Sequence, residues 1–80
     1  MLTSAQLRAA RALLRWSAAD LAMHSGVGTA TIQRMEVMDG IPSGHVKTLI
    51  ALKEALEQGG VQFVGAPDDS PGVRLTQLSK

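Results

Sequence analysis

Apolar positions recur at helical spacing near the start of the chain, directly after the pair Thr3-x-x-Gln6. This pair is a capping box, in which the Thr side chain accepts from the third backbone amide and the Gln side chain reaches back to the cap amide. Leu7, Ala10 and Leu14 then fall at i, i+3 and i+7, with no Gly or Pro among them. The pattern predicts a first helix, residues 4–14, with one buried stripe.

A second and shorter helical pattern follows in the stretch SAADLAMHSGVGTATIQRME, residues 17–36. Ser17 is a good N-cap residue, because its hydroxyl can accept from a backbone amide of the first turn. Asp20 places negative charge in that turn, where the helix dipole favours it. We expect a second helix from about residue 18 to 25, with Leu21, Ala22 and Met23 as its buried positions.

A glycine-centred break of three residues separates this helix from the next. Gly26 stands where helices often end in a left-handed residue, a conformation that Gly adopts at little cost. Gly28 can serve as the N-cap of a third helix over about residues 29–38. Its inward positions are Ile32 and Met35. A pair of helices bent this sharply is typical of a helix-turn-helix, whose second helix enters the DNA major groove.

A loop and a longer amphipathic pattern follow. The loop MDGIPSGH, residues 38–45, contains Asp39-Gly40, a turn signal, and Pro42, which disfavours helix before it. A fourth helix is expected over about residues 44–58. Its predicted buried positions are Val46, Leu49, Ile50, Leu52 and Leu56.

Two strand-like runs end the pattern, at residues 61–64 and 72–76, joined by the turn-rich segment 65–71. A two-stranded hairpin is marginal alone in water, so it must pack on the helices or on another copy. The predicted fold is therefore mainly α: a compact bundle of about four helices containing a helix-turn-helix, followed by a short C-terminal β-hairpin. We divide it into a DNA-binding domain, residues 1–58, and a tail, residues 59–80.

The amino-acid composition excludes several classes of protein but does not indicate one function. The 80 residues make one domain, and the absence of cysteine excludes disulfides and thiolate metal sites. Eight basic and seven acidic residues leave a net charge of only +1, so bulk charge does not indicate a nucleic-acid partner. No apolar run approaches membrane-spanning length and no signal-peptide pattern is present, so we expect a cytoplasmic protein. His24 and His45 belong to no nucleophile or metal constellation, so we expect neither an enzyme nor a bound cofactor or metal.

The middle of the sequence resembles a known family. The residues that carry the resemblance are Leu21-Ala22, Gly26-Val27, Thr31-Ile32, Arg34 and Glu36. Their spacing resembles the helix-turn-helix of the Cro/phage-repressor type, the XRE family, over about residues 3–58. The chain departs from the family pattern at Ala18, where a Gln is common, at Gly28, where Ser or Thr is common, and at Arg15, where Gly is common.

The resemblance implies roles for individual side chains. The first exposed turn of the third helix would face base edges, with Arg34 one turn later reading guanine. Candidate DNA-binding residues are Thr29, Ala30, Thr31, Gln33, Arg34, Ser17, Gly28, His45 and Lys47. Simpler alternatives are ordinary helix-start polarity for the threonines, a surface ion pair with Glu36 or Asp39 for Arg34, and plain solvent exposure for His45 and Lys47.

The resemblance also implies a structural ion pair between Arg11 on the first helix and Glu36 at the end of the third. Such a pair would fix how the third helix sits on the first. Arg8 and Arg15 share a face with Arg11, and for these two the expected role is a solvated surface that keeps the Ala-rich helix soluble.

Three functional hypotheses follow. The first is a sequence-specific transcriptional regulator that binds double-stranded DNA as a homodimer; the second is an antitoxin-like protein that binds its operator and also a toxin. The third is a protein-interaction module that has lost DNA binding, consistent with Ala18 and the low net charge. For the dimer, the alternating residues Val61, Phe63, Val73 and Leu75 are expected to form or cover the interface. The competing arrangement is a hairpin folded back on the fourth helix, with dimerisation only on DNA.

Overall fold

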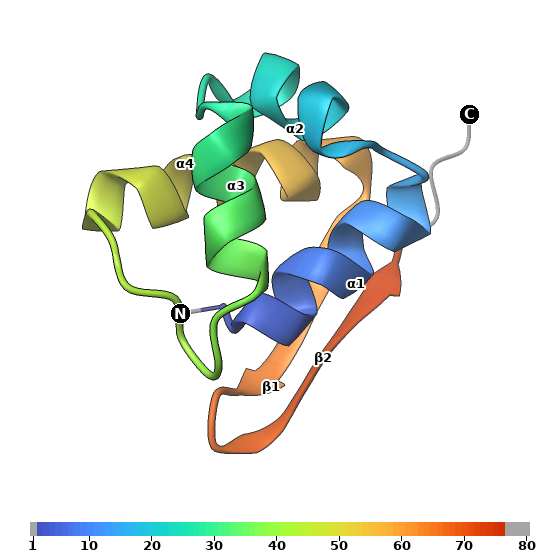
Figure 1. Ribbon diagram of the computed structural model, residues 1–80. Coiled ribbons are helices and arrows are strands. Elements are labelled where there is room, and N and C mark those ends of the chain that lie inside the picture. Colours follow the sequence, from blue (N-terminus) through green and yellow to red (C-terminus); the bar gives the residue numbers. More distant parts are fainter. Residues whose placement is uncertain (1, 77–80) are drawn as a thin grey trace.

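The computed structural model describes residues 2–76 (Figure 1). Its elements are α1 Ser4–Leu14, α2 Ala18–Ser25, α3 Thr29–Glu36, α4 Val46–Gly59, β1 Val61–Ala66 and β2 Asp69–Leu75. Four helices and a C-terminal antiparallel hairpin confirm the predicted fold class. No helix within residues 2–76 has the length and apolar character needed to cross a membrane.

Helix α1 begins and ends as its sequence predicts. Both bonds of the capping box are present: the Gln6 amide donates to Thr3 Oγ1 at 3.0 Å, and the Thr3 amide donates to Gln6 Oε1 at 2.8 Å. Leu7 and Ala10 are fully buried, while Leu14 is partly buried against the core. The helix ends at Arg15, which has φ 58° and ψ 34°, the left-handed conformation that usually falls to Gly.

Replacing Arg15 by Gly is expected to stabilise the protein by about 1 kcal/mol. A side chain with a Cβ in the left-handed region costs about 1–2 kcal/mol, and part of this gain is offset by the larger freedom of Gly in the unfolded chain. Thermal unfolding should show a midpoint about 4–8 °C higher. Ala9→Gly, on the exposed face of the same helix, is the control and should lower stability by about 1 kcal/mol. A fall in stability for Arg15→Gly would show that its side chain contributes more than its backbone strain costs.

The core lies where the four helices meet and includes the start of β1. Its fully buried side chains from α2, α3 and α4 are Leu21, Ile32, Met35, Leu52 and Leu56. Three predicted core positions are wrong, because Met23 is 73% exposed, Val46 is 60% exposed and Ile50 is 48% exposed. Val46 is the first residue of α4. Ile50 follows the buried Leu49, and consecutive residues of a helix point in directions about 100° apart.

Trp16 closes the junction of α1 and α2 over the end of α4. Its ring stacks on His24, with centroids 4.2 Å apart and planes 8° from parallel. The indole also lies close to Gly59, where a Cβ would come within 2.8 Å of Leu14 and 2.9 Å of Trp16. Gly59 therefore permits the close approach of these two side chains, and Trp16 is a packing residue of this junction.

The hairpin is longer than predicted and packs on its own chain. Strand pairing runs from Val61↔Leu75 to Ala66↔Asp69, with a bulge between Val64 and Ala66. The turn is therefore narrower than the expected segment 65–71, because Pro67, whose ring fixes φ, allows the strands to close around two residues. The hairpin lies on the side of α1 away from α3 (Figure 1).

Gln6 joins the hairpin to α1. While its Oε1 closes the capping box, its Nε2 donates to Val64 O at 3.2 Å and to Gly72 O at 2.9 Å. One buried amide thereby contacts both strands and its own helix cap. The sequence predicts only the cap for Gln6, because no local pattern indicates hydrogen-bond partners about 60 residues away in the chain.

Candidate nucleic-acid interface

The turn between α2 and α3 is the feature that sets the angle of α3. Gly26 has φ 79° and donates its amide to Ala22 O at 2.8 Å, which ends α2 in a left-handed residue. Val27 packs partly buried against the core, and Gly28 is the N-cap of α3. The turn therefore consists of three residues, as expected, and the small Ala22 lies half-buried beside it.

Helix α3 has one buried face and one exposed stripe. Ile32, Met35 and Glu36 are buried. The exposed positions are Ala30, Gln33, Arg34 and the C-cap Val37, which fall at i, i+3, i+4 and i+7 and so share one face.

This stripe differs in part from the expected set. Thr29 and Thr31 are half-buried and flank the stripe rather than form it. Val37, which is 80% exposed, was not among the candidates, although its spacing from Gln33 and Arg34 is the signal that could have found it. Neither Glu36 nor Asp39 forms an ion pair with Arg34 in the described part of the chain, so the guanidinium is available to a partner.

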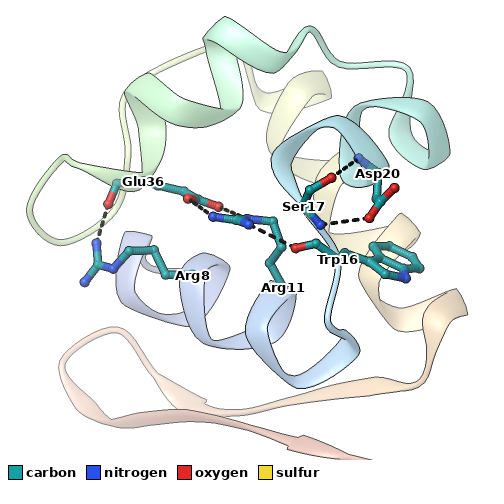
Figure 2. Close-up of polar contacts among 6 residues, drawn as sticks. All are labelled: Arg8, Arg11, Trp16, Ser17, Asp20 and Glu36. Carbon is teal, nitrogen blue, oxygen red and sulfur yellow. Dashed lines mark hydrogen bonds and ion pairs between the residues drawn. The ribbon is translucent and has the colours of Figure 1, made fainter.

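The carbonyl end of α3 is held by α1. The last carbonyls of a helix have no partner within it and must be satisfied from elsewhere. Ser4 Oγ donates to Met35 O at 2.7 Å, and the Arg8 guanidinium donates to Glu36 O (Figure 2). Arg8 was expected to be only a solvated surface charge, but its guanidinium binds the last carbonyl of α3. Positive charge at this end of α3 also complements its dipole.

Arg11 adds the strongest of these contacts. Its Nε donates to Glu36 Oε2 and its Nη2 to Glu36 Oε1, both at 2.8 Å, a bidentate pair (Figure 2). Its Nη1 donates to Trp16 O at 2.9 Å. The side chain of Glu36 is 7% exposed and that of Arg11 is 26% exposed. The hydrogen bonds with Glu36 raise the pKa of Arg11, so the guanidinium stays charged.

The amino ends of α2 and α3 differ. At α2, the Ser17 amide donates to the Asp20 carboxylate at 2.9 Å and the Asp20 amide donates to Ser17 Oγ at 3.0 Å. These hydrogen bonds with Ser17 lower the pKa of Asp20. The end of α2 is thus occupied by its own carboxylate, which leaves Ser17 little capacity for a phosphate. At α3, Gly28 offers no side chain, so the first-turn amides carry no side-chain cap.

The remaining candidates lie at the start of α4. His45 is the N-cap residue of α4 and makes no side-chain cap bond. Lys47 follows in the first turn, and both residues are exposed. Lys47 forms no ion pair with any residue between 2 and 76.

Three of the four hairpin side chains assigned to a dimer interface pack against their own chain. Val61 is 2% exposed, and Phe63 and Val73 pack partly buried against the core. Leu75 alone of the four is exposed, at 49%. The apolar face of the hairpin is therefore covered by α1 and α4. This agrees with the alternative in which the hairpin folds back on the fourth helix, except that α1 also contacts it.

Together these contacts present α3 as a rigid helix with hydrogen-bonding side chains on its open face. The described surface places Arg34, Gln33 and the uncapped amides of α3 on one element, whereas His45 and Lys47 come from a neighbouring one. A comparison with models of protein families found no match, and neither did a search of curated proteins.

Proposed function

We propose that the protein is a sequence-specific DNA-binding transcriptional regulator that acts as a homodimer and places α3 in the major groove. The observation that supports this most directly is the construction of α3. Its carbonyl end is fixed on α1 by Ser4, Arg8 and Arg11, whereas its amino end and its stripe of exposed side chains have no side-chain partner within residues 2–76. A helix that only filled a core would not need an open polar face held this firmly.

The stripe fits the chemistry of base edges. Arg34 can donate bidentately to O6 and N7 of a guanine, and Gln33 can pair with N6 and N7 of an adenine. Ala30 and Val37 offer apolar contact to thymine methyl groups at the two ends of the stripe. Thr29 is the first residue of α3 and half-buried, and we assign it to a base or the adjacent phosphate.

Phosphate contacts must come mostly from groups other than cations. The uncapped first-turn amides of α3 suit an anion, because the helix dipole is positive at that end. Lys47 and His45 can add to this from the start of α4. With few Lys and Arg residues near α3, counterion release is small, so the affinity should depend only modestly on salt.

Selection of bound duplexes from a random DNA pool tests the proposal. A two-fold symmetric motif with half-sites about one helical turn apart is the expected outcome for a dimer of this type. Recovery of no motif, with no duplex bound at low salt, would contradict DNA binding and favour the protein-interaction hypothesis.

Arg34→Ala is expected to weaken binding to the selected site by about 1–3 kcal/mol and to relax the preference at one base pair per half-site. Arg74→Ala, which removes the same charge from an exposed strand position bonded only to Gln62, is the matched control and should leave binding within about twofold. Fluorescence anisotropy with the parent site and its single-base variants measures both effects. Equal weakening of all sequences would assign Arg34 to a phosphate and not to a base.

A further inference from the structure

The loop that follows α3 contains the pair Asp39-Gly40, which has no part in the proposed DNA contacts. Both residues are exposed, and Gly40 has φ 65°. A Cβ added to Gly40 would meet no atom within 4 Å, so nothing crowds its α-carbon. The Gly40 amide donates to no backbone carbonyl within residues 2–76. An amide nitrogen in this position is accessible to the side chain that precedes it.

The side chain of an aspartate has the right length to form a five-membered ring with the amide of the next residue. For this ring, the peptide group between Asp39 and Gly40 must turn until the Gly40 nitrogen faces Asp39 Cγ. Opposite rotations about ψ of Asp39 and φ of Gly40 produce this turn with little movement of the flanking chain, and Gly tolerates either sign of φ. The Gly40 carbonyl belongs to the next peptide group. The hydrogen bond that it accepts from the Ser4 amide, at 2.8 Å, therefore leaves the reacting peptide group free to turn.

We propose that Asp39-Gly40 is a site of spontaneous succinimide formation and aspartate isomerisation in the folded protein. The Gly40 nitrogen forms a bond to Asp39 Cγ. One carbon–oxygen bond of the carboxylic acid breaks, and its oxygen leaves as water with the acid proton and the amide proton. Water then opens the ring at either carbonyl carbon. Opening at Cγ restores aspartate, whereas opening at the main-chain carbonyl leaves isoaspartate, with the chain running through Cγ.

The other aspartates within residues 2–76 are poorer candidates. The carboxylate of Asp20 accepts from the Ser17 amide at 2.9 Å, and the Leu21 amide that would attack it donates to Ser17 O at 3.1 Å. Asp68 and Asp69 are exposed at the hairpin turn, but each is followed by a residue with a Cβ. Each of these aspartates therefore lacks a following glycine, and Asp20 lacks a free amide as well.

Isomerisation would alter a segment that Ser4 holds at both ends. Ser4 Oγ donates to Met35 O at 2.7 Å, and the Ser4 amide donates to Gly40 O at 2.8 Å. The loop thus lies beside the start of α1 (Figure 1). Isoaspartate adds one methylene group to the main chain between these two acceptors. The hydrogen bond to Gly40 O lies directly after the altered residue, so we expect the modification to break this bond and to loosen the loop from α1.

Ageing of the purified full chain at neutral pH, without DNA, tests the site. Peptide mapping by mass spectrometry locates the product, with an isoaspartyl methyltransferase and labelled S-adenosylmethionine as the probe. Isoaspartate should accumulate at residue 39 at least about tenfold faster than at residue 20, where α2 must first open and each 1.4 kcal/mol of opening slows the reaction about tenfold. In urea, the rate at residue 39 should change by less than about tenfold, because the folded loop already permits ring closure. Asp68 and Asp69 are the controls for exposure alone.

Two substitutions of Asp39 separate the chemistry from general damage to the loop. Asp39→Glu keeps the carboxylate but would need a less favourable six-membered ring, so its loop should yield no product. Asp39→Asn should form the same succinimide faster, with ammonia as the leaving group, and aged samples of it supply the isoaspartyl form. In that form the Ser4 amide should exchange its hydrogen at least about tenfold faster than in the unaged parent. The Gln6 amide, which donates to Thr3 Oγ1, is the internal control. Circular dichroism shows whether each variant is folded.

All of these outcomes are measured without DNA, so they do not depend on the proposed function. Product at residue 39 of the folded parent, and none in Asp39→Glu, supports the site. Product at residue 39 that appears only in urea overturns it, because the folded loop would then prevent ring closure. Equal modification of Asp68 and Asp69 also overturns it, because exposure would then be sufficient without a glycine. Unchanged exchange of the Ser4 amide in aged Asp39→Asn would overturn the inferred loosening of the loop from α1.

Discussion

Replacing Arg11 by Ala is expected to lower the free energy of unfolding by about 3 kcal/mol. The change removes a bidentate partner from Glu36, whose side chain is 7% exposed, and leaves its carboxylate with little access to water. It also removes the donor to Trp16 O. Urea unfolding followed by circular dichroism measures the loss.

A double-mutant cycle shows how much of this loss comes from the pair. Glu36→Gln removes the charge that Arg11→Ala leaves unpaired, so the double variant should recover part of the lost stability. The exposed pair Lys53–Glu57, with 3.7 Å between Nζ and Oε2, is the matched control. Lys53→Ala should cost less than about 0.5 kcal/mol, because exposed helix pairs contribute little. Purely additive losses in the Arg11 and Glu36 variants would mean that the two side chains are not energetically coupled.

Gln6→Glu is expected to destabilise the protein by a similar amount, about 3 kcal/mol, and to detach the hairpin first. The new side chain keeps the oxygen that accepts from the Thr3 amide, so the helix cap survives. In place of the donor Nε2 it puts a second oxygen against Val64 O and Gly72 O, where like partial charges oppose one another. Loss of strand signal in NMR spectra at lower denaturant than helix signal would show the order of unfolding.

Gln62→Glu is the control for this change. It makes the same substitution in the hairpin, but Gln62 Oε1 accepts from Arg74 Nε at 2.7 Å on the exposed face. A carboxylate at this position should leave the free energy of unfolding unchanged or raise it slightly. Equal destabilisation by both variants would mean that the hairpin does not depend on the Gln6 contacts.

Acidification offers a second check on Gln6→Glu. Because the folded protein would hold the introduced carboxyl between carbonyl oxygens, its pKa there lies above the unfolded value of about 4.3. The folded state then binds the proton more tightly, so the variant's deficit should be smallest below that value and should grow as the pH rises through the folded pKa. A deficit independent of pH would point to packing and not to charge.

The elements of the fold could be predicted from the sequence where their signals are local. Thr3-x-x-Gln6, Ser17 and Gly26 act within one turn of the helix ends that they define, and those ends lie where they were expected. The angle between α2 and α3 follows from a three-residue turn in which Gly26 adopts the left-handed conformation. The residues that determine these helix ends and this turn lie next to them in the sequence.

Features that depend on distant contacts could not be predicted in this way. Helix α3 ends at Glu36, two residues before the expected Met38, at the point where Ser4 and Arg8 bind its last carbonyls. The residues that make these contacts lie far away in sequence and show no periodicity that indicates them. The exposure of Val46 and Ile50 has the same origin, because only the packed arrangement shows how far α4 extends past its neighbours.

The position of α1 between α3 and the hairpin has a thermodynamic consequence. Its side chains bind α3 through Ser4, Arg8 and Arg11, and bind the hairpin through Gln6. A change that stabilises the packing of α3 on α1 should therefore also stabilise the packing of the hairpin on α1. By thermodynamic linkage, the reverse also holds. A ligand that immobilises α3 should slow amide hydrogen exchange in β1 and β2, although it touches neither strand. On this account the hairpin and α3 belong to one cooperative unit that is joined through α1.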